Sequence, residues 1–247
     1  MRLAERTILV TGGTRGIGGE LTRQLIAKRA RILVVGQSAE TLEEIAGRHH
    51  GVITPFCCDL SDPEAVGELI SRVQRDHSEL SILINNAGIQ TEMDFASDDQ
   101  AQMTAVAQRE IAVNLNVAIA LSIGLLPTLR RQSSAAIVNV TSALAIAPKQ
   151  ASPVYCATKA GLRSFTKALR YQLSETAPNI LISEIIMALV DTDMTRGRGA
   201  GKISPGKAAT EIITGLEDDR PEVWVSKAKL LKLVNRLSPQ LAERILR

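Results

Sequence analysis

Short apolar runs alternate with longer amphipathic stretches along this chain. The short runs are rich in Val, Ile and Leu with few polar positions, which is typical of strands buried on both faces of a parallel sheet. Between them, apolar residues recur at the three- and four-residue spacing of helices with one buried face. We predict seven strands, at 7–10, 31–35, 52–57, 81–85, 136–141, 180–186 and 222–225.

The longest helical pattern spans about 101–130. Alternating strands and helices predict an α/β fold in which a parallel sheet is covered on both faces, and right-handed crossovers make it doubly wound. A Rossmann-type sheet of this kind places its ligand crevice at the carboxyl ends of its strands. We find no interdomain linker or internal repeat, so we predict a single domain over residues 1–247.

Composition narrows the function classes. The net charge is only +3 and the aromatic content 2%, so the stacking platforms of a nucleic-acid-binding protein are almost missing. Three cysteines cannot all pair, and we interpret them as thiols of a cytoplasmic protein. No Cys/His spacing indicates a metal. We see no signal peptide at the N-terminus and expect no segment to reach the length of a transmembrane helix.

The C-terminal segment KAKLLKLVNRLSPQLAERILR interleaves leucines with basic residues. One interpretation is an amphipathic helix that binds a membrane surface or a partner protein. The other is a helix that packs its leucines on the core or on another subunit and leaves its charges in water. We favour the second and expect no membrane contact.

A strand, a glycine-bearing turn and a helix follow one another in TILVTGGTRGIGGEL, at residues 7–21. Gly12, Gly16 and Gly18 permit a tight turn and let backbone N–H groups and the helix N-terminus approach a pyrophosphate. The first gap is one residue longer than in the common dinucleotide fingerprint. The position after the first strand favours a dinucleotide site over an ordinary glycine loop.

Tyr155 and Lys159 are four residues apart on a predicted helix and therefore share one face. A free tyrosine has a pKa of about 10, and a neighbouring cation lowers it towards neutral pH. Alone, this pair also fits a solvated helix face. Ser142, thirteen positions before the tyrosine, and Asn114 favour a catalytic role.

In sequence order, these motifs resemble those of the short-chain dehydrogenase/reductase family over almost the whole chain. The stretches NNAGIQTEMDF and PVYCATKA are also similar to reductases encoded in bacterial operons for D-alanylation of lipoteichoic acid. The resemblance implies an oxidoreductase that transfers a hydride between a nicotinamide cofactor and a small carbonyl or alcohol substrate. The matching motifs are Thr11-Gly12-x-x-x-Gly16-x-Gly18, Asp59-Leu60, Asn85-Asn86-Ala87-Gly88, Asn114, Ser142 and Tyr155-x-x-x-Lys159.

The family's catalytic roles fall on matching residues of this chain. By resemblance, Tyr155 is the general acid/base and Ser142 holds the substrate oxygen. Lys159 lowers the tyrosine pKa and binds the nicotinamide ribose. Asn114 holds a water that connects Lys159 to solvent.

A larger set of residues is assigned to the cofactor by the same resemblance. Asp59 contacts adenine, although an Asp at this place could instead cap the next helix. The full set is Gly12, Thr14, Arg15, Gly16, Ile17, Gly18, Gln37, Ser38, Asp59, Leu60, Asn86, Ala87, Gly88, Tyr155, Lys159, Val190 and Thr192.

The end of the second strand bears on the choice between NAD(H) and NADP(H). NAD-specific sites place an acid there to bind the ribose diol, whereas this strand ends without one. Arg15 can pair with a 2′-phosphate, and Gln37 and Ser38 can donate hydrogen bonds. Many NADP-dependent relatives carry an arginine where Gln37 stands, and Arg15 could simply face solvent. We predict NADP(H) over NAD(H).

The substrate side departs from the family pattern. Met187-Ala188 replaces the usual Pro-Gly, which puts the turn beside the nicotinamide in question. The loop at 193–206 has no aromatic residue, which argues against a deep apolar pocket for a steroid. Its basic residues Arg196, Arg198 and Lys202 could meet an anionic substrate or simply be solvated. A cofactor-binding scaffold or redox-responsive protein with little turnover stays as the alternative.

The long helical pattern is apolar over more than one face. Its apolar side chains spread more widely than one core-facing stripe; they are Val106, Ile111, Leu115, Ile119, Leu121 and Leu125. We therefore predict a homodimer or homotetramer that packs helices 101–130 and 153–174 against their symmetry mates.

Overall fold

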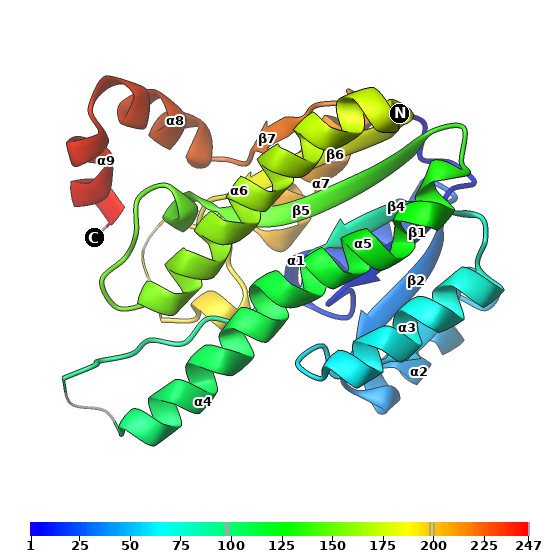
Figure 1. Ribbon diagram of the computed structural model, residues 1–247, viewed down its shortest axis with the longest axis horizontal. Helices are drawn as coiled ribbons and strands as arrows, with labels where there is room; N and C mark the ends of the chain where they lie inside the picture. The colour runs from blue at the N-terminus through cyan, green and yellow to red at the C-terminus, as the bar shows by residue number, and fades with distance from the viewer. Residues whose placement is uncertain (97–98, 198, 200, 247) are drawn as a thin grey trace.

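The apolar runs form a seven-stranded parallel sheet in the order β3-β2-β1-β4-β5-β6-β7 (Figure 1). The computed structural model describes residues 1–96, 99–197, 199 and 201–246. Each strand boundary lies within one residue of its predicted place, which confirms the predicted fold class. The strands are β1 Thr7–Thr11, β2 Arg31–Gly36, β3 Ile53–Cys57, β4 Leu80–Asn85, β5 Ala135–Ser142, β6 Ile180–Met187 and β7 Glu222–Trp224.

Helices cover both faces of the sheet. One apolar cluster joins it to α1, α2 and α7, and a second joins it to α3, α5 and α6, which lie in front in Figure 1. Both faces of the sheet are therefore shielded from water, which explains why the strand sequences are continuous apolar runs. The helices are α1 Gly16–Ala27, α2 Ala39–Arg48, α3 Pro63–Asp76, α4 Gln100–Ile111, α5 Val117–Arg130, α6 Pro153–Thr176, α7 Pro205–Glu217, α8 Ala228–Leu237 and α9 Pro239–Leu246.

The order in which successive strands are added to the sheet reverses at β1. Strand β1 pairs with β2 on one side and with β4 on the other. A crevice opens at the carboxyl ends of strands at such a switch point. Helix α4 and the α8–α9 pair project beyond this end of the sheet (Figure 1).

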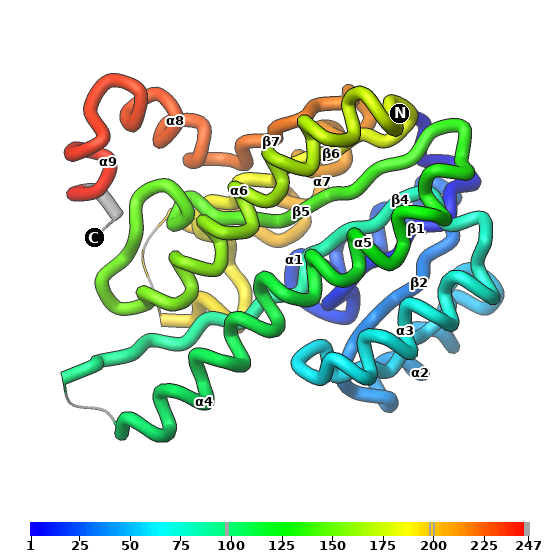
Figure 2. Tube along the Cα trace, in the orientation of Figure 1, coloured from blue at the N-terminus to red at the C-terminus, as the bar shows by residue number. Residues whose placement is uncertain are grey.

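The predicted long helix is one rod in the backbone trace but has three parts (Figure 2). A π-helical turn, Ala112–Asn116, joins α4 to α5. The whole span Gln100–Arg130 has 31 residues, and an 18-residue window within it has a mean hydropathy of 1.8, so it is long and apolar enough to cross a membrane by length and composition alone. The expectation that no segment would reach that length was wrong, because two asparagines interrupt the apolar run without lowering its average enough. In this fold α5 buries Leu121 and Leu125 in the core.

Candidate active site

The glycine turn after β1 brings helix and strand into very close contact. Gly12 and Gly16 have φ of +63° and +56°, in the left-handed region that favours glycine. A Cβ placed on Gly18 would lie 2.0 Å from the Gly12 carbonyl oxygen, so no side chain fits there. The turn therefore exposes backbone and the N-terminus of α1 at the carboxyl edge of the sheet, as a pyrophosphate site requires.

The turn after β4 is tied directly to the glycine turn. Thr11 Oγ1 accepts hydrogen bonds from the backbone N–H groups of Asn86 and Ala87, both at 3.0 Å. Asn86 Nδ2 donates to the Thr11 carbonyl at 3.0 Å. Asn86 thus has a clear structural role at the switch point, whatever it contacts in a ligand.

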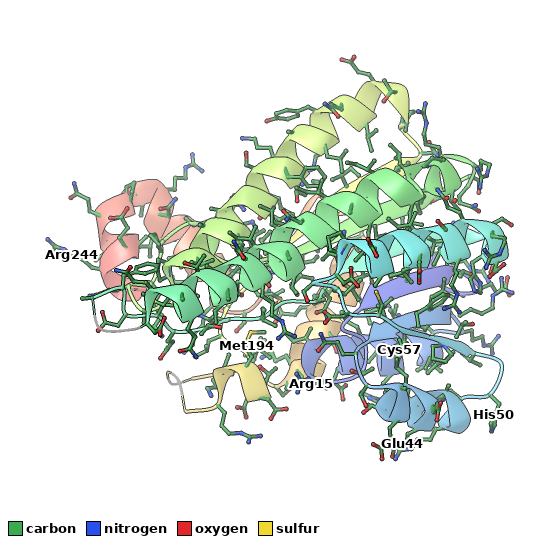
Figure 3. The ribbon with its side chains drawn as sticks, turned by 60° about the horizontal axis from the view of Figure 1, so that its bottom comes forward. Arg15, Glu44, His50, Cys57, Met194 and Arg244 are labelled. Carbon is green, nitrogen blue, oxygen red and sulfur yellow. The ribbon has the colours of Figure 1, made fainter. Side chains whose placement is uncertain are left out.

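Arg15 projects from the glycine turn on the edge that also carries Met194 (Figure 3). Its side chain is exposed and has no hydrogen bond or ion pair within the described ranges. Ser38 Oγ accepts from Thr41 N–H at 3.2 Å and so caps α2, which leaves its own hydroxyl proton free to donate. Thr14 packs its methyl group over Gly36 beside them.

Asp59 follows β3 and does not cap the next helix. Its Oδ1 accepts from Gln37 Nε2 at 3.1 Å and from Ser61 N–H at 2.9 Å, and the bonds from Ser61 hold its pKa below the usual range. The cap of α3 is Asp62. Leu60 is buried in the core, so only its backbone is available to a ligand.

Ser142, Tyr155 and Lys159 converge where β5 ends and α6 begins. Ser142 is close enough to the Tyr155 hydroxyl to lower its pKa, and the Ser142 Oγ accepts from Leu144 N–H at 3.1 Å. Lys159 Nζ lies 5.8 Å from the centre of the Tyr155 ring and donates to the Val140 carbonyl at 2.9 Å. The three side chains predicted to do the chemistry are therefore neighbours.

Burial dominates the ionisation of this pair. Loss of solvent raises the pKa of Tyr155 to about 12, although the hydrogen bond with Ser142 acts in the opposite direction. Burial also lowers the pKa of Lys159 to about 8. The expectation that Lys159 pulls the tyrosine pKa down was wrong for the protein alone, because desolvation penalises both charged forms more than they stabilise each other.

Asn114 lies in the π-helical turn and clamps the segment after Gly88. Its Oδ1 accepts from Ile89 N–H, and its Nδ2 donates to the Ile89 carbonyl, both at 2.8 Å. A second Nδ2 bond reaches Thr158 Oγ1 at 3.2 Å on the catalytic helix. The predicted water relay stays a prediction, since the side chain itself is engaged in these protein contacts.

Glu110 is a residue that sequence reasoning missed. Its side chain is fully buried, its pKa is raised by that burial, and Oε1 accepts from Thr91 N–H at 2.8 Å. It stands four residues before Asn114 and supports the same loop. That spacing, with an acid inside an apolar helix, was the available signal.

The turn that lacks Pro-Gly forms nonetheless. Val190 pairs with Ile203 in a parallel bridge, and Asp191 N–H donates to the Ile203 carbonyl at 2.9 Å. Thr192 and Thr195 then close a short turn through reciprocal hydrogen bonds. Contacts with the returning loop thus replace the rigidity that a proline would supply.

These turns enclose a cleft of about 540 Å³. Eight predicted residues line it. The other predicted cofactor residues surround the glycine turn and the ends of β2 and β3, and Asn114 lies behind Gly88. The eight are Ile17, Asn86, Gly88, Ser142, Tyr155, Lys159, Val190 and Thr192.

Much of the remaining lining is apolar, with no Phe or Trp among the described lining residues, so the expectation against a deep pocket for a steroid stays a prediction. The apolar side chains come from the end of β6 and the turn after it, from η2 (Ala143–Ala145) and from α8, with Met194 as the contribution of the aromatic-free loop. Helix α8 also differs from expectation, because Leu231 is buried while Leu230, Leu233 and Leu237 are exposed. The missed apolar residues include Leu144, Leu189, Met194, Leu230, Leu231 and Val234.

Arg196 and Lys202 of the loop after β6 are not among the described residues that line the cleft. Arg196 pairs with Asp193, and Lys202 Nζ donates to the Thr195 carbonyl at 2.6 Å. Arg198 lies outside the described residues. Lys149 and Lys227 line the cleft instead.

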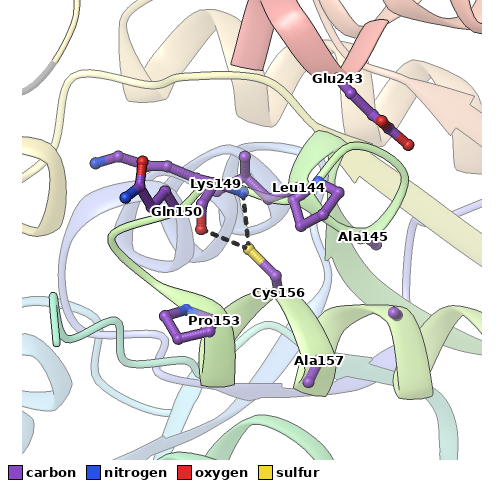
Figure 4. A pocket seen from close by; sticks show the side chains of 10 residues that line it. Leu144, Ala145, Lys149, Gln150, Pro153, Cys156, Ala157 and Glu243 are labelled. Carbon is purple, nitrogen blue, oxygen red and sulfur yellow. Dashed lines mark hydrogen bonds between the residues drawn. The ribbon is translucent and has the colours of Figure 1, made fainter. Parts of the chain in front are cut away.

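A second cavity of about 620 Å³ lies on the other side of Leu144 and Lys149 (Figure 4). It is the larger of the two but contains none of the reacting groups. Cys156 in its wall is buried, with Sγ accepting from Lys149 N–H at 3.3 Å, and burial raises the pKa of this thiol. An unreactive, structural cysteine fits these surroundings.

Comparison with known proteins places this site in a family. The family model described as short chain dehydrogenase matches residues 6–202. The uncharacterized oxidoreductase DltE of Bacillus subtilis (strain 168) is 33% identical over 242 residues, which cover 96% of this chain and 94% of that protein. The chain belongs to the short-chain dehydrogenase family.

This short-chain dehydrogenase is also 30% identical over 204 residues to the NADP-dependent 3-hydroxy acid dehydrogenase of Schizosaccharomyces pombe, covering 78% of this chain and 75% of that one. A short chain dehydrogenase from Burkholderia cenocepacia J2315, solved in complex with NADP, shares the fold with a TM-score of 0.86 at 22% identity, over 100% and 99% of the two chains. The protein is thus a dehydrogenase/reductase enzyme. The predicted family and DltE-like subgroup are confirmed.

Proposed function

We propose that this short-chain dehydrogenase reduces a small carbonyl compound with NADPH, with Tyr155 as the proton donor. The observation that carries the proposal is that Ser142, Tyr155 and Lys159 line one cleft together with Ile17 of the glycine turn, with Lys159 Nζ 5.8 Å from the centre of the Tyr155 ring. Both halves of a hydride-transfer site, a nucleotide cradle and an acid, meet at one edge of the sheet.

The cradle suits a dinucleotide with a 2′-phosphate. Gly18 leaves no room for a side chain next to the Gly12 backbone, Arg15 is unpaired within the described chain, and Ser38 sits at the N-terminus of α2. Cationic and helix-terminal groups of this kind stabilise a phosphate. The yeast relative named above is NADP-dependent, and the Burkholderia structure contains NADP. Bound NADPH supplies the hydride.

The protein's own residues supply the proton and hold the substrate. As negative charge develops on the carbonyl oxygen, Ser142 donates a hydrogen bond to it and Tyr155 transfers its phenolic proton. Because burial raises the pKa of Tyr155 to about 12, the phenol is fully protonated at neutral pH. This protonation state favours reduction, whereas alcohol oxidation needs the tyrosinate and should accelerate as the pH rises.

The test is Tyr155→Phe, followed by NADPH absorbance over a panel of aldehydes and ketones. We expect kcat to fall by roughly 10²–10⁴-fold while NADPH affinity, measured by calorimetry, stays within a factor of about two, because only the acid is lost. Tyr171→Phe is the matched control, since Tyr171 is the other tyrosine and is 62% exposed on the same helix.

Substantial turnover by the Tyr155→Phe protein would refute this mechanism. A wild-type protein that binds NADPH but reduces no carbonyl compound would favour the alternative, a cofactor-binding scaffold.

A further inference from the structure

We propose that the substrate is amphiphilic, with an anionic group bound by Lys227 and an apolar chain that lies against α8. This inference rests on the proposed reductase function and names its substrate class. It follows from the charges, the free space and the apolar wall of the cleft.

Lys227 stands where β7 leads into α8, and it lines the cleft. Its ammonium group has no hydrogen bond or ion pair among the described residues, whereas Lys229 bonds Glu211 at 2.8 Å and Lys149 bonds Glu92 at 2.6 Å. Among the described lining residues there is no carboxylate. The cleft therefore presents an uncompensated cation to whatever enters it, and an anion is its natural partner.

Lys227 extends into a space that is free because the facing residue of the loop after β6 is a glycine. Gly201 has φ of +70°, and a Cβ placed on it would lie 2.2 Å from Lys227 Nζ. Any other residue there would displace the ammonium group. Gly201 is thus the feature that admits this cation to the cleft.

The rest of the substrate side is a wall for hydrocarbon. Leu189 and Met194 face it from the β6 turn, and Leu231 and Val234 from α8. Each methylene group of a substrate that this wall removes from water should strengthen binding by a factor of about three to four. A cation at one end and an apolar wall beyond it match a carbonyl compound with an acyl-like chain and an acidic head.

The experiment compares a medium-chain oxo acid with its neutral methyl ester and with an oxoalkyl phosphate of the same length. Wild-type kcat/KM should favour the anions over the ester by roughly 10–100-fold, as expected of a charge-assisted hydrogen bond. Lys227→Gln should remove this preference by lowering kcat/KM for the anions far more than for the ester, without weakening NADPH binding. The two anions distinguish a carboxylate from a phosphate as the natural head group. The matched control is Lys229→Gln, a neighbouring lysine that is paired with Glu211.

Three results would overturn the proposal: no anion preference in the wild type, an equal loss for the ester, or weaker NADPH binding by Lys227→Gln, which would place Lys227 on a cofactor phosphate. If no carbonyl compound is reduced at all, binding of octanoate to the NADP-saturated protein, measured by calorimetry, still tests the anion site at Lys227. Binding that is lost in Lys227→Gln supports the site, and absence of binding to the wild type refutes it.

Discussion

Desolvation shapes the chemistry of this protein at the scale of single residues. Tyr155 and Lys159 lie side by side, yet each is pushed towards its neutral form, with pKa values of about 12 and about 8. Sequence spacing gave their proximity correctly but could not give their burial. A cofactor phosphate or ribose is one source of the interactions that would restore the charged lysine.

The depressed pKa of Lys159 predicts a pH-dependent stability of the protein without cofactor. The unfolded lysine titrates near pH 10.4 and the folded one near pH 8, so between these values the unfolded state binds more protons and stability rises with pH. Relative to Lys159→Met, the wild type should gain about 2 kcal/mol between pH 7 and pH 9.5. Urea unfolding at both pH values measures this gain.

Lys167→Met, an exposed lysine on the same helix, is the control and should show no such difference. If the free energy of unfolding changed with pH in the same way for the wild type and Lys159→Met, other groups would have to stabilise the buried ammonium.

Arg15 predicts the cofactor preference. Arg15→Ala should weaken NADPH binding about 10–100-fold and leave NADH binding unchanged, because only NADPH has a phosphate to lose its charge-assisted partner. Calorimetric titration with both nucleotides is the measurement. Arg23→Ala is the control, since Arg23 lies on the same helix and pairs with Glu20 at 2.8 Å. Tighter binding of NADH than NADPH by the wild type would reverse the assignment.

At the scale of elements, the strands were predictable because a buried parallel strand is a short, continuous apolar run with few alternatives. The π-helical turn at Ala112–Asn116 was not, since its cause is tertiary: Asn114 is drawn to the Ile89 backbone. The sequence also did not reveal that α8 contributes to the wall of the cleft. Amphipathic spacing shows that a helix has an apolar face, but not that this face lines the active site.

Two glycines in helices should respond in opposite ways to alanine. A Cβ on Gly215 of α7 would lie 2.3 Å from Val223 Cγ2, and valine has little freedom to move away. Gly215→Ala should therefore destabilise the fold by about 1–3 kcal/mol. Gly67 of α3 has nothing within 4 Å of that position, so Gly67→Ala should stabilise by about 0.5–1 kcal/mol. Urea midpoints that move in the same direction for both would contradict this packing of α7 on β7.

At the scale of the whole molecule, an apolar stripe faces away from the sheet. It follows one face of the long helix at four-residue spacing through Ile111, Leu115, Ile119 and Ile123. Ile111 is 39% and Ile123 66% exposed, which is costly for a monomer in water. This stripe is the surface that we predict a second copy to cover, together with α6.

Ile123→Lys should therefore convert the oligomer to monomer and lower activity with it, because α6 carries Tyr155 and Lys159. Sedimentation at micromolar concentration measures the first effect and NADPH turnover the second. Leu237→Lys is the control, since Leu237 is equally apolar and 77% exposed but lies on α8. A fully active wild-type monomer would rule out the interface.

The sheet order also has a consequence for synthesis on the ribosome. Strand β1 emerges from the ribosome well before its second neighbour β4, which begins at Leu80, the partner of Thr7. At roughly 5–20 residues per second, one edge of the central strand waits several seconds for its partner. No hairpin can shield it in the meantime, because every neighbouring pair is parallel. The nascent chain should therefore depend on chaperones until β4 is free of the exit tunnel.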